Sequence, residues 1–276
     1  MLALWSVAIM GYKGFSLRRG QNFGALRMEA PRGITLVATQ TVADATRVRA
    51  LGSPKVDVTG SIKFDVVVPQ AAKDTGAWLR TRINGRPVLL CASTREGEEA
   101  LILDAYKRMA QKPEGMLLAI VPRHPQRFDE VAALVASKGL SLARRSQLGE
   151  DLAIDADVLL GDSMGEMFAY YEACDVAYIG GSLPPLGGQN LIEACALARP
   201  VIVGPHTFNF EQATEEAIAA GGAMRVGDAA ELVEQGVRLL QDRGARATMG
   251  ERAATFAGAH GGATLRTLEL LRPLIH

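Results

Sequence analysis

Short apolar runs alternate with longer amphipathic segments along most of the chain. The runs are rich in Val, Ile and Leu, which is typical of strands buried on both faces of a parallel sheet. They occupy residues 36–40, 55–60, 87–93, 116–122, 157–162, 175–181, 200–205 and 223–226. Segments 96–111 and 129–139 have the apolar spacing of amphipathic helices. Residues 87–226 are therefore predicted to form one doubly wound α/β domain with a parallel sheet.

The two ends of the chain have other patterns. From Asp228 onward the pattern is helical to the end. The first 70 residues contain two of the strands and one short helix, and residues 66–76 have the composition of a linker. We therefore interpret residues 1–68 as the remnant of a preceding element and residues 69–276 as the main domain.

Three of the predicted strands are followed by the same kind of helix start. A side-chain oxygen at the N-cap and a glutamate three residues later form a capping box or its Asn variant. The three pairs are Ser93 with Glu96, Ser163 with Glu166, and Asn190 with Glu193. Capping alone explains any one pair. Helix starts at the carboxyl ends of parallel strands meet at one crevice, however, and their N–H groups favour a phosphate.

Other features of the same strand ends support an anion site. Arg123 and His124 follow the strand at 116–122, and an arginine there can bind a phosphate through two hydrogen bonds. The Gly-Gly pairs at 180–181 and 187–188 are expected to let a ligand approach the backbone. Neither G-x-x-x-x-G-K-[ST] nor G-x-G-x-x-G occurs. The crevice therefore favours a sugar nucleotide over a P-loop ligand or a dinucleotide.

Composition excludes several classes of protein. The 276 residues are 48% apolar and carry 30 basic and 30 acidic side chains, which gives no case for nucleic-acid binding. The three cysteines are far apart, so neither a disulfide framework nor a metal site is expected. The apolar stretch 1–10 is too short to span a bilayer. Segment 13–32 has five basic residues against one acidic residue, which is either a solvated face or a contact with anionic membrane lipid.

One motif favours a different class. The sequence from Gly161 to Gly165 matches G-x-S-x-G, the nucleophile elbow of α/β-hydrolases. Ser163 would then be the nucleophile, and the other two members of its triad would come from Asp175 or Asp228 and from His206 or His260. Asp175 opens the next predicted strand and Ser163 is already an expected N-cap, so a serine hydrolase is a remote alternative.

Six motifs together resemble one family. GSIKFD, CASTREGEE, VPRHPQRF, GDSMGEM, DVAYIGGSLPPLGGQNLIEA and GPHTFNF are similar, in that order, to motifs of the Kdo (3-deoxy-D-manno-octulosonic acid) transferases. The resemblance covers roughly residues 34–272. It implies a glycosyltransferase-B fold with two Rossmann-like halves. It also implies transfer of Kdo from CMP-Kdo to a lipid A precursor, in lipopolysaccharide synthesis at the cytoplasmic face of the inner membrane.

The resemblance also implies site residues. Lys63 would stabilise charge in the transition state, as a cation near a departing phosphate does. No cofactor is implied, and none of Glu29, Glu96 and Glu98 lies in the motif expected of the general base. The CMP contacts would be Pro122, Arg123, Met164, Gly165, Glu166, Asn190, Leu191, Ile192 and Glu193.

On this basis residues 1–68 are expected to be the end of the acceptor-side domain with a linker, and residues 69–276 the CMP-sugar donor-binding domain. Without an identified base, the isolated chain is expected to bind CMP but not to transfer Kdo. Two alternatives stay open at this point, a non-catalytic sugar-nucleotide binding module and an enzyme related to UDP-N-acetylglucosamine 2-epimerase.

Overall fold

The computed structural model describes residues 7–9, 34–53, 55–149 and 153–274, so the basic segment 13–32 lies outside the described residues. The chain divides into two compact units. The smaller unit consists of Met1–Asp65 together with Ala259–His276, and the larger unit is Val66–Gly258. The chain therefore passes between the units twice.

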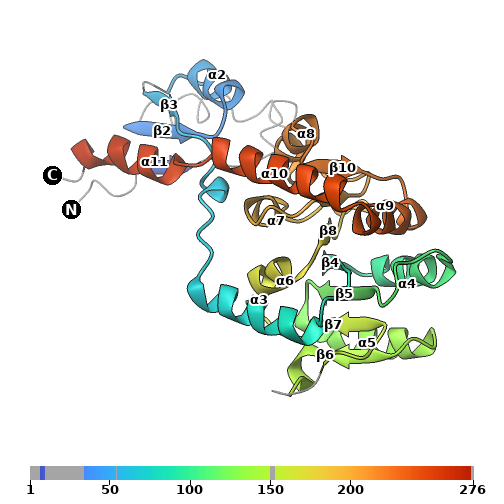
Figure 1. Ribbon diagram of the computed structural model, residues 1–276. Coiled ribbons are helices and arrows are strands. Elements are labelled where there is room, and N and C mark those ends of the chain that lie inside the picture. The colour runs from blue at the N-terminus through green and yellow to red at the C-terminus, as the bar shows by residue number, and fades with distance from the viewer. Residues whose placement is uncertain (1–6, 10–33, 54, 150–152, 275–276) are drawn as a thin grey trace. The chain divides into compact units, whose positions relative to one another are not determined.

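A seven-stranded parallel sheet forms the centre of the larger unit (Figure 1). Its strand order is β10-β9-β8-β4-β5-β7-β6. The predicted strands between residues 87 and 226 are confirmed, and β6 was missed. The strands are β4 (Val88–Thr94), β5 (Leu117–Pro122), β6 (Leu142–Arg144), β7 (Val158–Leu160), β8 (Val176–Ile179), β9 (Val201–Val203) and β10 (Ala223–Arg225).

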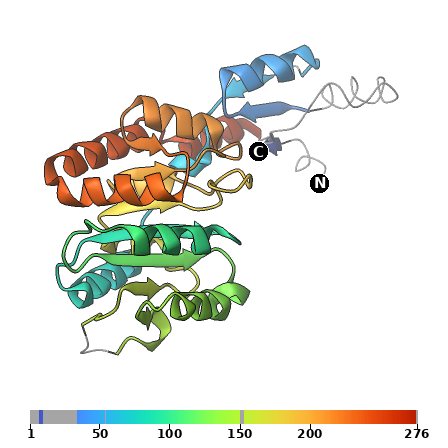
Figure 2. The same cartoon turned by 90° about the vertical axis from the view of Figure 1, so that its right-hand side faces the viewer.

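Helices cover both faces of this sheet, which confirms the doubly wound α/β prediction (Figure 2). Strand β4 contacts α6 on one face and α9 on the other, and its first five residues are fully buried. The helices are α3 (Gln70–Ile83), α4 (Glu98–Arg108), α5 (Phe128–Ser137), α6 (Met167–Ala173), α7 (Ile192–Ala196), α8 (Glu211–Ala219), α9 (Ala229–Gln241) and α10 (Arg243–Ala259), with 3₁₀ turns η3 (Pro125–Arg127) and η4 (Arg145–Gln147).

The predicted linker at 66–76 is wrong over most of its length, because α3 begins at Gln70. Gly76, the last residue of the predicted linker, lies within this helix. In the helix it allows close packing on α6, since a Cβ at Gly76 would lie 2.5 Å from the Cβ of Glu172. Its glycine is therefore a packing residue and does not mark a loop.

The smaller unit contains a three-stranded parallel sheet in the order β1-β2-β3. Val37, Ala45 and Val56 form its buried core. Its elements are β1 (Val7–Ile9), β2 (Leu36–Thr39), α2 (Val42–Ala50), β3 (Val56–Val58), η2 (Ile62–Phe64), α11 (Ala263–Leu271) and η5 (Arg272–Leu274). Strands β2 and β3 confirm the two predicted in this region.

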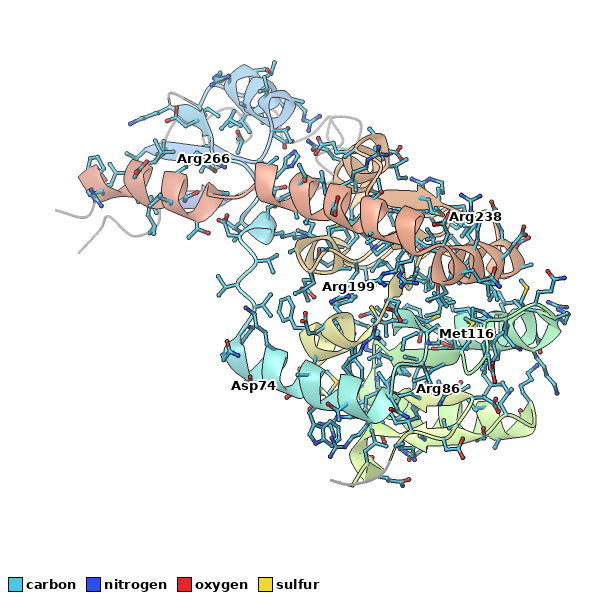
Figure 3. The ribbon with its side chains drawn as sticks, viewed as in Figure 1. Asp74, Arg86, Met116, Arg199, Arg238 and Arg266 are labelled. Carbon is cyan, nitrogen blue, oxygen red and sulfur yellow. The ribbon has the colours of Figure 1, made fainter. Side chains whose placement is uncertain are left out.

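Helix α11 belongs to the smaller unit although it lies about 200 residues further along the chain. The Asp65 carboxylate accepts hydrogen bonds from the N–H groups of Gly262 and Thr264 at its start. Arg266, labelled in Figure 3, donates to the carbonyl of Thr59 at 2.9 Å. The structure thus differs from the predicted domain limits, because residues 259–276 group with the N-terminal segment and the division falls at Asp65.

Within the described part of the chain, no helix has both the length and the apolar composition that a bilayer span requires.

Candidate functional site

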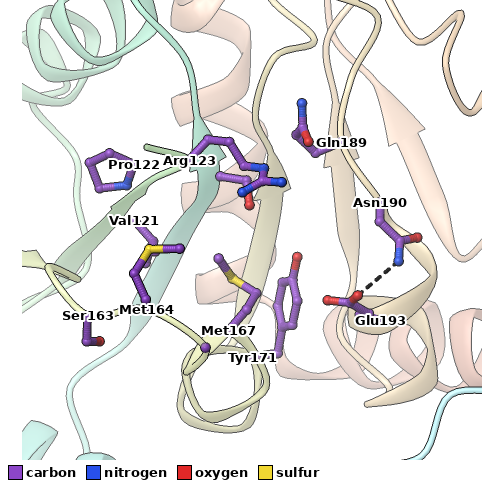
Figure 4. A pocket seen from close by; sticks show the side chains of 12 residues that line it. Val121, Pro122, Arg123, Ser163, Met164, Met167, Tyr171, Gln189, Asn190 and Glu193 are labelled. Atoms are coloured by element: carbon purple, nitrogen blue, oxygen red, sulfur yellow. Dashed lines mark hydrogen bonds between the residues drawn. The ribbon is translucent and has the colours of Figure 1, made fainter. Parts of the chain in front are cut away.

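A pocket of about 250 Å³ opens at the carboxyl ends of β4, β5 and β7 and beside the loop after β8 (Figure 4). Strand β4 lies between β5 and β8, so the order of the strands reverses here, and ligands of doubly wound sheets bind at such a switch point. The lining residues are Ser93, Val121, Pro122, Arg123, Ser163, Met164, Gly165, Met167, Tyr171, Gln189, Asn190 and Glu193.

Six of the nine residues that the sequence predicted for CMP line this pocket: Pro122, Arg123, Met164, Gly165, Asn190 and Glu193. Glu166, Leu191 and Ile192 do not line it. Leu191 and Ile192 are each only 1% exposed and belong to the apolar core beneath the pocket. The Glu166 carboxylate bonds to Ser163 and Arg145. These three residues support the lining and do not form it.

Arg123 follows β5 directly, and its backbone N–H donates to the carbonyl of Thr94 at 2.9 Å. Figure 4 shows its side chain extending from the end of β5 toward Gln189. The side chain is exposed, and no acceptor for its guanidinium occurs among the described residues. A cation at the rim of a pocket without a protein partner is suited to an anionic ligand.

The loop between β7 and α6 is held from outside the pocket. The Asp162 side chain is 2% exposed and accepts hydrogen bonds from Arg144 and Ser146. Arg145 donates to Glu166 at 2.9 Å and stacks over Trp78. This network fixes both ends of the loop, so the exposed Met164 and Gly165 project into the pocket from a rigid base.

Ser163 does not act as predicted. Its hydroxyl bonds to Glu166 and to the Tyr170 hydroxyl, whereas α6 begins after Glu166 without a side-chain cap. The predicted N-cap role is therefore wrong. Neither His206 nor His260 is a partner of this hydroxyl within the described residues. The predicted triad needs a histidine on Oγ, so the arrangement disfavours the hydrolase alternative.

Asn190 organises the opposite wall. Its side-chain oxygen accepts from the N–H of Ile192 at 3.1 Å, and its amide donates to Oε1 of Glu193 at 3.0 Å (Figure 4). The predicted Asn190 N-cap is wrong, because α7 begins at Ile192 with Leu191 at its N-cap and without a side-chain cap, so Asn190 lies one residue before the cap. Burial raises the pKa of the Glu193 carboxyl, and the hydrogen bond from Asn190 opposes that rise. Burial and the nearby Glu193 raise the pKa of Tyr171, which keeps this phenol neutral.

The first predicted capping box is wrong. Helix α4 begins at Glu98 after Gly97, and Ser93 is still part of β4. Ser93 has φ of 56° at a bulge where the register between β4 and β5 shifts. This left-handed conformation is uncommon for a residue other than glycine and places Ser93 in the pocket wall.

The glycine pairs also serve another purpose than the one predicted. Neither pair lines the pocket. A Cβ at Gly180 would lie 2.5 Å from the carbonyl oxygen of Ser93, so this glycine allows close approach of two backbone segments. Gly181 has φ of 70°, and its N–H donates to Glu98. Gly180 therefore accommodates the backbone at Ser93, whereas the pocket is lined by Gln189 and Asn190 at the far end of this loop.

Sequence reasoning missed six lining residues: Ser93, Val121, Ser163 as a lining residue, Met167, Tyr171 and Gln189. One signal was available for two of them. Met167 and Tyr171 are four residues apart on α6, so they lie on the same face of the helix. Val121 and Gln189 adjoin predicted contacts, whereas the bulge that brings in Ser93 has no recognisable sequence pattern.

Lys63 lies on η2 of the smaller unit, whereas all twelve lining residues belong to the larger unit. The pocket is thus built without it.

The chain is similar to known proteins over most of its length. The profile of a family described as 3-deoxy-D-manno-octulosonic-acid transferase (kdotransferase) matches residues 13–66. The 3-deoxy-D-manno-octulosonic acid transferase of Bordetella pertussis is 47% identical over 94% of this chain, and that of Haemophilus influenzae is 36% identical over 88%. The chain spans 61% and 57% of the length of these two relatives.

A solved structure matches the larger part of the chain. The C-terminal CMP-Kdo binding domain of WaaA from Acinetobacter baumannii superposes with a TM-score of 0.64 at 32% identity. The match covers 68% of this chain and 98% of that domain. The doubly wound sheet and this match identify the larger unit as a Rossmann-like domain of the kind found in glycosyltransferase-B folds. The chain belongs to the Kdo transferase family.

Proposed function

We propose that the pocket binds the CMP part of CMP-Kdo, and that the larger unit is the donor-binding domain of an enzyme that transfers Kdo to a lipid A precursor. The observation that carries this proposal is a switch-point pocket with an unpaired rim arginine on one side and the Asn190–Glu193 pair on the other, within the described residues. The likeness to a CMP-Kdo binding domain over nearly the whole of that domain supports the same ligand.

The lining suggests how the nucleotide is held. Arg123 would bind the phosphate through its guanidinium. The Glu193 carboxylate, already oriented by Asn190, would accept hydrogen bonds from the ribose hydroxyls. Pro122, Met164 and Gly165 would contact the base or ribose through apolar atoms and backbone groups. The Ile192 N–H is already bonded to Asn190, so it is not one of the phosphate donors in this proposal.

The remaining steps concern the acceptor. Lys63 would stabilise negative charge as CMP departs. The lipid A precursor would be reached at the cytoplasmic face of the inner membrane, during lipopolysaccharide synthesis. Segment 13–32, with its excess of positive charge, would contact anionic lipid there.

Calorimetric titration of the chain with CMP and with UMP tests the donor proposal directly, because it needs no turnover. CMP is expected to bind at one site and UMP much more weakly. Equal affinity for the two nucleotides, or no binding of either, would contradict the proposal.

A transfer assay tests the acceptor steps. The chain is incubated with a CMP-Kdo-generating system and a lipid A precursor, with a full-length transferase of the same family as the positive control. In that control enzyme, alanine at the lysine equivalent to Lys63 should lower kcat and leave CMP affinity unchanged. A loss of CMP affinity instead would make this lysine a binding residue.

A further inference from the structure

The carboxylate of Glu98 is completely buried at the first residue of α4, although no sequence motif assigned it a role. Its Oε2 accepts from the N–H groups of Arg95 and Gly181, both at 2.7 Å. Its Oε1 accepts from the Tyr178 hydroxyl at 2.6 Å and from the N–H of Leu183 at 3.2 Å. Burying a charged group is costly unless hydrogen bonds satisfy it, and four donors do so here.

These four donors come from two separate segments beside the pocket. Arg95 belongs to the turn that follows Ser93, which lines the pocket on one side. Gly181 and Leu183 open the glycine loop, the segment from Gly180 to Asn190, whose last two residues line the pocket on the other side. One carboxylate thus connects the backbone of both walls.

Backbone hydrogen bonds within the glycine loop connect the residues that Glu98 binds to the residues that line the pocket. The carbonyl of Gly181 accepts from the N–H of Gly188 at 2.8 Å, and the carbonyl of Gly180 accepts from the N–H of Gln189 at 3.1 Å. The start of the glycine loop is therefore bonded to its end. When Glu98 fixes Gly181, these bonds also fix the position of Gln189. Asn190 is the next residue, so its position is fixed as well.

We propose that Glu98 is a positioning residue for nucleotide binding, which holds the Ser93 turn and the glycine loop at the separation that the nucleotide requires. It touches no ligand and acts through Gly181 and Leu183. This inference rests on the proposed function, since the ligand is taken to be CMP. Its geometric part, that Glu98 fixes the loop, can be tested without any ligand.

The substitution Glu98→Gln is suited to the test because it keeps the size of the side chain. Each carboxylate oxygen accepts from a loop N–H, one from Gly181 and the other from Leu183. An amide has only one oxygen, so in either orientation its NH₂ group faces one of these N–H groups. One of the two anchors at the start of the loop is therefore lost.

Glu99→Gln is the matched control. Glu99 is the next residue on α4 and is also completely buried. Its carboxylate accepts from Thr94 Oγ1 and from Arg127, each at 2.7 Å, and from no atom of the glycine loop. The two variants change the same kind of buried acid, so a general loss of stability should affect both.

Two measurements are made on the wild type and both variants, below the melting temperature of each. Amide hydrogen exchange at Gly181 or Leu183 should accelerate by about tenfold or more in Glu98→Gln and stay near the wild-type rate in Glu99→Gln. The Kd for CMP should rise by about fivefold or more in Glu98→Gln and by less than about twofold in Glu99→Gln.

The outcomes separate the two proposals. Equal loss of affinity in both variants, or unchanged exchange at Gly181 and Leu183 in Glu98→Gln, overturns the positioning role. If the wild type binds no CMP, the proposed function fails, and the exchange measurement still decides whether Glu98 fixes the loop. If Glu98→Gln does not fold, Tyr178→Phe, which removes one donor to the same carboxylate, takes its place. Exchange is then read at Gly181 alone, because the Tyr178 hydroxyl itself accepts from the N–H of Leu183.

Discussion

The Asn190 amide donates to Oε1 of Glu193 at 3.0 Å while its own oxygen accepts from the N–H of Ile192 at 3.1 Å. One short side chain therefore fixes both the acid of the pocket and the first turn of α7. Both bonds join groups of the protein itself, so this wall is held in shape by its own contacts.

Asn190→Ala should lower the free energy of unfolding by about 0.5–1.5 kcal/mol, because the Ile192 N–H loses its side-chain hydrogen bond. CMP affinity should fall as well, because Glu193 loses its orienting partner. Asn190→Asp separates the two effects, since it keeps an oxygen that accepts from the Ile192 N–H and removes the donor to Glu193. Chemical denaturation measures the free energy of unfolding, and calorimetry measures the affinity for CMP. If Asn190→Asp binds CMP as tightly as the wild type, the pairing with Glu193 has no role in binding.

The raised pKa of Glu193 predicts a pH dependence of stability. A carboxyl whose pKa is higher in the folded state than its ordinary value of 4.5 favours folding when protonated. That contribution is complete below pH 4.5 and is lost as the pH rises through the folded pKa. As the pH rises above 4.5, the free energy of unfolding of Glu193→Gln should therefore increase relative to that of the wild type. Denaturation curves between pH 4 and about 8 measure the difference, and a constant offset would contradict the prediction.

Arg123→Ala should weaken CMP binding by about 1–3 kcal/mol, the cost of losing a charge-assisted hydrogen bond. Its side chain is exposed, so the melting temperature should barely change. Arg108→Ala is the control, because Arg108 is an exposed arginine at the end of α4 and does not line this pocket. A lower melting temperature with unchanged affinity would make Arg123 a structural residue.

Ser163 distinguishes a transferase from a hydrolase. Its hydroxyl bonds to Glu166 and Tyr170, so a fluorophosphonate probe should not label it. Ser163→Ala should cost about 0.5–1.5 kcal/mol of stability, the usual contribution of a hydrogen bond. Mass spectrometry of the probe-treated protein, with a serine hydrolase as the positive control, measures labelling. Stoichiometric modification of Ser163 would mean that this serine is an activated nucleophile.

The sheet could be predicted because its strands are continuous apolar runs such as Val88–Ala92. An amphipathic helix has polar residues at regular intervals and does not produce such a run. Strand β6 was missed because Leu142–Arg144 is a short, half-buried edge strand with a charged end. The linker prediction failed at α3 because Gly76 acts through its contact with Glu172, which sequence spacing does not reveal.

The pocket was predicted in part for a similar reason. Arg123 and Asn190 were accessible to sequence reasoning because strand ends and helix starts have local patterns. Leu191 and Ile192 match the same motif but point into the core, and only the packing of α7 decides which residues face a ligand. The role of Glu98 depends on hydrogen bonds to residues more than 80 positions away, beyond any local pattern.

The double passage of the chain between the units has a consequence for proteolysis and for fragment design. A protease that cuts between Asp65 and Val66 leaves α11 on the C-terminal fragment, while its capping carboxylate stays on the N-terminal one. The fragments should therefore remain associated after a single cut, and only a second cut near Gly258 would release the larger unit. A gene fragment encoding residues 66–258 is accordingly the one to express as a self-contained unit that contains the pocket. A fragment of residues 66–276 would also carry α11, without the N-terminal residues to which that helix bonds.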